Sequence, residues 1–360
     1  MDKLLVKAPI NSTSLGNVSL NILREMFLLD LEVALVPVQD SIDISAFDGL
    51  SDDFRAWLGA CFKHRHKMLD RKTPTFKIWH IKDSFEKLSD KSFLYTFYEL
   101  NKPTFTEMKI LKMHDGVMFS SSHAANCFNQ SGLKSCTYIP LGLDPDFKSV
   151  KRASRKDVVH FGLMGKFEKR KQTKNIIKAW AKNYGDRKGY LLTCAITNKF
   201  MPIEKLNAEL SEALEGKKYF NINFIPFLPK NSEVNQFLNN IDIDLTGLSG
   251  AEGWNLPAFN STCLGKWSCV QNVTSHKDWA TPKNSVLVEP GIEISPDDGI
   301  FFKTGLDYNQ GTIHHMSELA LMTAMEDAEK KVGEVNLKGL ELPQKFSYKN
   351  TTEKILEKIF

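Results

Sequence analysis

The stretch Ala251-Glu252-Gly253-Trp254-Asn255-Leu256-Pro257-Ala258-Phe259-Asn260 decides the fold, and it follows a short apolar run, Ile243–Thr246. It reads as the end of a strand, a glycine turn that carries an acid, and the first turn of a helix. Proline is tolerated at the start of a helix, and Gly265 stands where such a helix would end. The pattern predicts a helix N-terminus, whose free N–H groups and positive dipole end favour a bound phosphate. Glu252 would then need another partner, such as a sugar hydroxyl.

Short apolar runs of strand length alternate with amphipathic segments along most of the remaining chain. Such alternation is typical of parallel sheets with helices on both faces. We expect strands at 4–8, 33–38, 76–81, 93–97, 116–120, 137–140, 158–163, 190–196, 221–225, 243–246, 268–271 and 286–288, and helices at 17–29, 104–113, 122–130, 173–184, 203–214, 232–239 and 256–264. Two halves of this kind predict an α/β fold in which two Rossmann-like domains face each other across a cleft.

A polar and basic run over residues 146–157 separates the two halves, because it lacks apolar periodicity. It predicts one domain over residues 1–150 and a second over 151–345. Near the C-terminus, Ile355, Leu356 and Ile359 fall on one side of an amphipathic pattern, which predicts a final helix.

Composition narrows the class of protein. The 360 residues are 42% hydrophobic and 25% charged, with a net charge of +4, which is typical of a globular protein. No run approaches the roughly 18–20 apolar residues of a membrane span. The N-terminus lacks a signal-peptide pattern, so we expect a cytoplasmic protein. Six scattered cysteines without metal-ligand spacing favour reduced thiols, and we expect neither a metal site nor a cofactor.

A concentrated basic run, Lys63-His64-Arg65-His66-Lys67, lies in the first half. Such a run is usually a solvated face of the protein. The alternative, functional interpretation is that the run binds an anionic partner, such as a nucleic acid, a membrane surface or a phosphorylated lipid. The sequence leaves both open.

Two loops that follow strands carry further candidates. After the first strand, a polar loop leads through Gly16 into a helix, and it could lie against a phosphate or simply cap the helix. At the start of the second half, a strand ends near Gly165 and cations including Arg170 and Lys171 follow. Cations after the first strand of a parallel sheet face its ligand crevice, so these two could neutralise a diphosphate. A surface charge run would look the same from this segment alone.

Taken together, ordered segments resemble one known family. They are Leu94–Leu100 with its acid Glu99, Val117–His123 with its serines, Tyr138–Asp144, Gly165–Lys171, and Glu252–Pro257 with its following Gly-Lys turn. The set is similar to family 4 retaining glycosyltransferases, which have the GT-B fold, and the similarity covers roughly residues 1–290. It implies transfer of a sugar from a nucleoside diphosphate sugar, such as a UDP or GDP sugar, to an acceptor hydroxyl. It also implies that a C-terminal helix, residues 346–360, packs back toward the first domain.

The resemblance implies roles for individual residues. Arg170 and Lys171 would stabilise the departing nucleoside diphosphate in place of a metal ion, and Glu252 would hold hydroxyls of the donor sugar. Backbone groups and neighbouring side chains would complete the donor site at Gly16, Gly165, Gly253, Trp254, Asn255, Leu256 and Asn260. Preorganised cations and helix N-termini aimed at growing negative charge are a strong catalytic device.

Three positions depart from the family pattern, and one of them is Trp267, which stands where a proline is usual after the Gly-Lys turn. Asn260 stands where the family has a second glutamate, which holds the ribose hydroxyls. An asparagine can still hydrogen-bond a diol, but without charge assistance. Gln172 stands where a glycine is usual. Asn260 motivates an alternative function, a non-catalytic binding module that retains the GT-B fold.

The acceptor is expected on the first domain, and it could be a glycan, a lipid-linked molecule or modified DNA. His80 and Glu99 follow strand-like runs and could reach the cleft, although a histidine and an acid in such places can also be structural. The basic run contributes Lys63, Arg65 and Lys67, which would suit a phosphate backbone or peripheral contact with a membrane. A Rossmann oxidoreductase is disfavoured, because no dinucleotide-binding glycine fingerprint is present.

Overall fold

A computed structural model describes residues 3–66, 70–150 and 157–360. The first domain contains a six-stranded sheet in the order β2-β1-β3-β4-β5-β6, and all of its neighbouring strands are parallel. Its strands are β1 (Lys3–Ile10), β2 (Glu32–Ile42), β3 (Thr75–Ile78), β4 (Ser92–Thr96), β5 (Gly116–Phe119) and β6 (Cys136–Tyr138), and its helices are α1 (Ser14–Leu28), α2 (Asp52–His64), α3 (Phe105–Leu111) and α4 (Ser122–Phe128). Strands β3 and β4 are buried throughout, as expected for a sheet covered on both faces.

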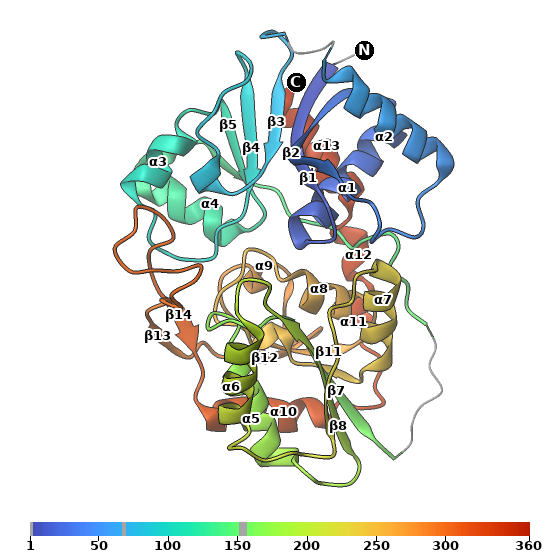
Figure 1. Cartoon of the computed structure of the whole chain (residues 1–360), viewed down its shortest axis with the longest axis vertical. Helices are drawn as coiled ribbons and strands as arrows, with labels where there is room; N and C mark the ends of the chain where they lie inside the picture. Colours follow the sequence, from blue (N-terminus) through green and yellow to red (C-terminus); the bar gives the residue numbers. More distant parts are fainter. Residues whose placement is uncertain (1–2, 67–69, 151–156) are drawn as a thin grey trace.

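The second domain repeats this architecture below the first in Figure 1. Its parallel sheet has the order β12-β11-β10-β7-β8-β9. The strands are β7 (Val159–Lys166), β8 (Tyr190–Thr197), β9 (Ile222–Phe224), β10 (Ile243–Asp244), β11 (Trp267–Gln271) and β12 (Val286–Val288). The helices are α5 (Thr173–Tyr184), α6 (Ile203–Ala213), α7 (Asn231–Asn240), α8 (Leu256–Cys263), α9 (His276–Trp279) and α10 (Glu318–Glu329). The predicted α/β fold with two Rossmann-like domains is confirmed.

Three further features complete the chain. An antiparallel pair, β13 (Ile292–Ile294) and β14 (Ile313–His315), was not expected from the sequence, and neither was α10. The last helices are α11 (Leu337–Leu340), α12 (Leu342–Lys345) and α13 (Tyr348–Ile359). Helix α13 lies beside α1 of the first domain, and Thr351 Oγ1 donates to the Pro140 carbonyl at 2.7 Å.

An apolar cluster spans the two domains. Trp254 and Phe259 of the second domain pack edge-to-face on Phe346, with ring centroids 5.6 and 5.8 Å from it. The same cluster includes Tyr95 and Ile139 of the first domain. Burial of these rings therefore holds the second domain, the C-terminal segment and the first sheet together.

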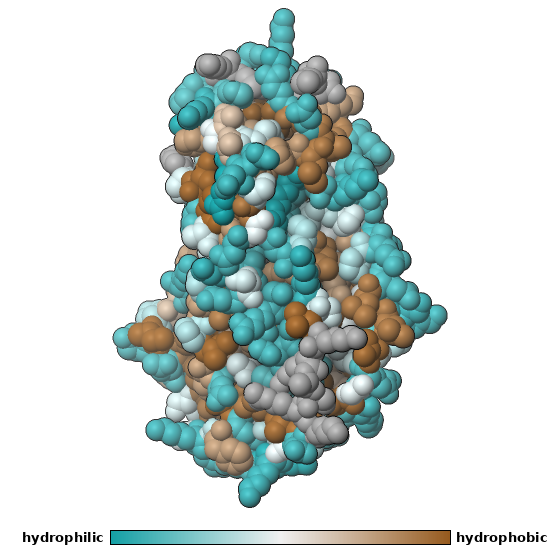
Figure 2. Space-filling model, turned by 90° about the vertical axis from the view of Figure 1, so that its right-hand side faces the viewer, coloured by the Kyte–Doolittle hydropathy of each residue, from teal (hydrophilic) through white to brown (hydrophobic). Residues whose placement is uncertain are grey.

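No helix in the described part of the chain is long and apolar enough to cross a membrane. On the face in Figure 2, apolar residues gather in small separate groups among hydrophilic ones. All six cysteines are free thiols, and five of them are buried.

The shared cluster makes Phe346 important for stability. Phe346 is 2% exposed, and replacing it by alanine leaves a cavity between Trp254 and Phe259. We expect Phe346→Ala to lower the free energy of unfolding by about 3–5 kcal/mol in urea titrations. The control is Phe360→Ala, because that ring is 53% exposed and its loss should change stability by less than about 0.5 kcal/mol. Equal effects of the two changes would contradict the shared cluster.

Candidate active site

A buried ion-pair cluster lies at the carboxyl end of β7. Lys171 Nζ is 2.5 Å from Glu252 Oε1, and Arg170 Nη1 is 2.9 Å from Glu252 Oε2. Arg170 Nη2 also donates to Glu168 Oε1 at 2.6 Å, and Nη1 donates to the Ala251 carbonyl. The structure therefore brings together the three residues expected to be catalytic, which come from two loops about eighty positions apart in the sequence.

Electrostatics keeps this cluster charged. Burial alone would raise the pKa of the Glu252 carboxyl, but the adjacent Arg170 and Lys171 hold it well below its usual range. Burial disfavours the charged form of Arg170 as well, but Glu252 and Glu168 outweigh it and raise the pKa of the guanidinium. A buried charged pair of this kind is stable only while both partners are present.

The backbone around Lys171 is shaped by two unusual residues. Gly165 has φ +133°, and a Cβ there would lie 3.4 Å from Cδ of Lys171, so the lysine chain lies directly over the glycine. Gln172 adopts the left-handed conformation, φ 54°, at the position where the resembling family has glycine. Its side chain donates to the Leu248 carbonyl at 2.7 Å and accepts from Met316 N–H at 2.8 Å, which compensates for the strained backbone.

The expected donor-site loop touches the first domain. A Cβ on Gly253 would lie 3.1 Å from Cβ of Phe97, and the Gly253 carbonyl accepts from Ser120 Oγ at 2.7 Å. Trp254 is buried in the shared apolar cluster, so its side chain is structural. Leu256 begins α8, whose first N–H groups lack partners within the helix.

Asn255 and His276 fix the start of α8. Asn255 has φ 68°, and its Nδ2 donates to the Thr246 carbonyl at 3.1 Å. The same amide lies 3.0 Å from His276 Nε2, while His276 Nδ1 lies 2.8 Å from the Gln271 carbonyl. This arrangement requires Nδ1 to carry the proton and Nε2 to accept. Burial lowers the pKa of His276 to about 4, so the ring is neutral at pH 7.

Asn260 lies one turn into α8 and is buried. Its Oδ1 has no hydrogen-bond partner within the described residues. A buried amide oxygen without a partner is costly.

A recess between the domains contains His80, Glu99 and Lys166. The side chains of His80 and Lys166 are exposed to solvent, yet the surrounding protein lowers the pKa of His80 to about 4 and lowers that of Lys166. A side chain that is both accessible and desolvated lies in a recess rather than on an open surface. Glu99 is half-buried, and burial together with the Glu252 and Glu168 charges raises its pKa against the opposing effect of Arg170. Glu99 and Lys166 both feel the charges of Arg170, Lys171 and Glu168, and Lys166 in turn acts on His80.

Sequence reasoning missed Lys166. The charge run after Gly165 drew attention to Arg170 and Lys171, but Arg170 is buried and both of its Nη atoms are occupied. Lys166 is the last residue of β7 and is accessible. Its position at the carboxyl end of the strand is the signal that could have identified it, because that edge of a parallel sheet faces the ligand crevice.

The remaining expected residues lie on the first domain. Gly16 lies in the first turn of α1 and packs against the preceding loop, where a Cβ would lie 2.1 Å from the Asn11 carbonyl oxygen. Its neighbour Asn17 accepts a hydrogen bond from Asn231 of the second domain at 2.8 Å, so this helix start faces the second domain. Lys63 and Arg65 lie at the end of α2 near the amino ends of the first-domain strands, opposite the cluster (Figure 1). Lys67 lies outside the described residues. The structure therefore does not bring the basic run to the recess.

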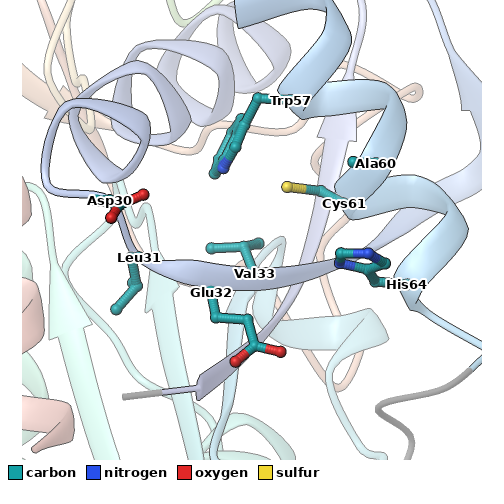
Figure 3. Close-up of a pocket in the computed structure, with 8 residues that line it drawn as sticks. All are labelled: Asp30, Leu31, Glu32, Val33, Trp57, Ala60, Cys61 and His64. Atoms are coloured by element: carbon teal, nitrogen blue, oxygen red, sulfur yellow. The ribbon is translucent and has the colours of Figure 1, made fainter. Parts of the chain in front are cut away.

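A cavity of about 200 Å³ lies beside that end of α2. Figure 3 shows Trp57, Cys61 and His64 projecting from α2 toward the turn that leads into β2. The thiol of Cys61 is unreactive at neutral pH, because burial raises its pKa to about 12. This cavity is remote from the ion-pair cluster and takes no part in the candidate site.

Among the described residues, no group of three or more His, Cys, Asp or Glu side chains could hold a metal ion.

No protein-family model matches the chain, and no curated protein matches it by sequence. Solved structures do match its fold over almost the whole length. A sucrose-phosphate synthase from Thermosynechococcus elongatus gives a TM-score of 0.69 at 12% identity, covering 99% of this chain and 98% of that one.

Two more solved structures match the fold of this chain over almost its whole length. The lipopolysaccharide outer core galactosyltransferase WaaB, in its apo form, gives a TM-score of 0.62 at 13% identity and covers 100% of this chain and 99% of its own. The Anabaena protein HepE, in complex with UDP and glucose, gives 0.60 at 14% identity and covers 99% of both chains. The chain thus has the GT-B fold, as its resemblance to family 4 glycosyltransferases implied.

Because His276 is buried in its neutral form, the stability of the folded protein should depend on pH. Its pKa is lower in the folded protein than its ordinary value of about 6.5, so stability is complete above that pH and decreases as the pH falls toward 4. We expect the wild type to lose about 2 kcal/mol of unfolding free energy at pH 5 through this residue. The variant His276→Gln should show a smaller loss in urea titrations at pH 7.5 and 5. The control, His66→Gln, changes an exposed residue and should keep the wild-type pH dependence.

Proposed function

We propose that this protein is a glycosyltransferase that moves a sugar from a nucleoside diphosphate sugar to an acceptor hydroxyl, with retention and without a metal ion. One observation carries the proposal. Lys166, Lys171 and Glu252 meet at the carboxyl end of β7, beside the N-terminus of α8 and opposite the first domain. This is the part of a doubly wound fold where ligands bind.

The chemistry assigns distinct tasks to the charged groups. The bond between the anomeric carbon and the diphosphate oxygen breaks, and the acceptor oxygen bonds to the same carbon. Negative charge grows on the departing diphosphate, where Lys166, Lys171 and the N–H groups of α8 stabilise it. The departing phosphate takes the acceptor's proton. Glu252, held by Arg170, orients hydroxyls of the donor sugar.

The solved structures support this proposal. One is a sucrose-phosphate synthase and another a galactosyltransferase, and HepE was solved with UDP and glucose bound. Asn260 Oδ1, buried and without a protein partner, is a suitable acceptor for a ribose hydroxyl of such a nucleotide. Neutral His80 faces the same recess and can hydrogen-bond a sugar.

We place the acceptor, whether a glycan, a lipid-linked molecule or modified DNA, in the recess beside His80 and Glu99. Lys63 and Arg65 are too far from the cluster to hold an acceptor at the reacting carbon. That run is a candidate for peripheral contact with an anionic surface, in a protein that we propose to be cytoplasmic.

Specific observations favour the alternative function, a non-catalytic binding module. Asn260 lacks the charge that a glutamate would offer a ribose, and both oxygens of Glu252 are already paired with cations. A donor would have to compete with Glu252 for Lys171.

A thermal-shift panel separates these functions. We expect one nucleotide sugar among UDP and GDP sugars to raise the melting temperature in the presence of EDTA, because a ligand that binds only the folded state stabilises it. Asn260→Glu should increase the shift through charge-assisted hydrogen bonds to the ribose. Asn126→Glu, which changes an exposed residue of α4, is the matched control and should leave the shift unchanged. Absence of any shift would favour the binding module.

Turnover of the donor identified by that panel tests the roles of the side chains. Lys171→Met and Lys166→Met should each lower kcat by roughly 10²–10³-fold, the usual cost of removing one electrostatic contact to a transition state. Glu252→Gln should also lower it by orders of magnitude while the protein stays folded. Lys178→Met removes a surface lysine of α5 and should retain wild-type turnover. Near-native turnover in all three site variants would contradict the proposed chemistry.

A further inference from the structure

The antiparallel pair β13 and β14, with its connection 295–312, forms an arm that we call the interdomain arm. In Figure 1 it extends from the second domain to α3 and α4 of the first. Its base lies against the loop that precedes Glu252, since His314 N–H donates to the Gly250 carbonyl at 3.0 Å. Gly250 N–H in turn donates to the Arg170 carbonyl at 2.8 Å. The base of the arm is thus part of the framework that holds the ion-pair cluster.

The tip of the arm is docked on the first domain by paired polar contacts. Asn101 Nδ2 donates to Thr312 Oγ1 at 2.7 Å, and Thr312 N–H donates to Asn101 Oδ1 at 3.0 Å. Asn309 N–H donates to the buried carboxylate of Glu107 at 2.9 Å. The fit is close, because a Cβ on Gly311 would lie 2.4 Å from Asn101 Oδ1.

A turn inside the arm fixes two neighbouring phenylalanines, and one of them also contacts Lys166. Asp298 Oδ1 accepts from the N–H groups of residues 300, 301 and 302 at 2.8, 2.8 and 3.0 Å, which fixes the turn. Phe302 is 5% exposed and packs in an apolar cluster with Leu94 and Tyr98 of the first domain. Phe301 is partly exposed; it packs against the edge of the same cluster, and its ring also faces Lys166.

Phe301 and Phe200 hold the Lys166 ammonium between them. Lys166 Nζ lies 4.7 Å from the centroid of the Phe301 ring and 5.6 Å from that of Phe200. The two rings meet edge-to-face, with centroids 5.0 Å apart. A cation in a partly desolvated recess gains more from such faces than one in open water.

We infer that Phe301 is a positioning residue for Lys166, and that docking of the interdomain arm on the first domain sets its position. The assignment of Lys166 to the donor diphosphate rests on the proposed function, whereas the mechanical link from Asn101 to Lys166 does not. Because the turn at Asp298 joins Phe301 to Phe302, the tip cannot leave the first domain without moving the ring that holds the lysine. Closure of the two domains and placement of the cation are therefore one event.

Competitive acetylation of lysines, read by mass spectrometry on the whole protein, tests the link without any assay of activity. Phe301→Leu keeps an apolar side chain but removes the aromatic face, and Asn101→Ala undocks the tip through an exposed residue. Both should make Lys166 acetylate severalfold faster than in the wild type. Gly311→Ala, which forces the tip away from Asn101, should act in the same direction. Phe220→Leu is the matched control, because that ring is 66% exposed, and it should leave the rate unchanged.

Turnover of the nucleotide sugar provides the second measurement. Phe301→Leu should lower kcat roughly five- to thirtyfold, with a smaller change in donor KM, and Phe301→Trp should restore it. If Lys166 acetylates at the wild-type rate in all the arm variants, the inference is overturned whatever the turnover. If acetylation changes as expected but the wild type consumes no nucleotide sugar, the arm's hold on Lys166 stands and the proposed function fails.

Discussion

The buried pair between Arg170 and Glu252 is the interaction on which the rest of the site depends. Removing two charges from water is costly, and their attraction compensates only when every remaining hydrogen-bonding group is also used. Arg170 meets most of that condition, because its two Nη atoms reach Glu168, the Ala251 carbonyl and Glu252, while its buried Nε has no partner among the described residues. The pair therefore fastens the loop after β7 to the loop before α8. Lys171 and the N-terminus of α8 keep their places only while this connection holds.

Burial decides which cation is free to meet a ligand, and a charge run in a sequence does not reveal burial. Lys166 ends strand β7 and Arg170 follows it in the next loop, yet Arg170 is buried in ion pairs and Lys166 is accessible. The left-handed conformations of Gln172 and Asn255 could not be predicted from the local sequence either. In each case the side chain of the residue itself hydrogen-bonds to backbone groups of another segment, which compensates for the strained backbone. Local sequence could identify the two loops but not the division of roles within them.

The fold was more predictable than the site. Strands buried on both faces give continuous apolar runs, and the alternation of such runs with amphipathic helices specifies parallel sheets. That signal ends after β12. The connection 295–312 has little regular structure and is held by contacts with Asn101 and Glu107, far away in the sequence. Helix α10 was missed although Leu321, Met325 and Ala328 follow helical spacing and are buried.

Glu252 is held by both domains rather than by one. On one side of it, Ala251 packs in the apolar cluster that contains Tyr98, while on the other Trp254 belongs to the cluster that contains Tyr95. Between them, Ser120 of the first domain donates to the Gly253 carbonyl. Apolar contacts cannot be exchanged for water without loss, so separation of the domains would strain this loop from both ends. The carboxylate that we propose to hold a sugar is thus positioned by the same packing that brings the two domains together.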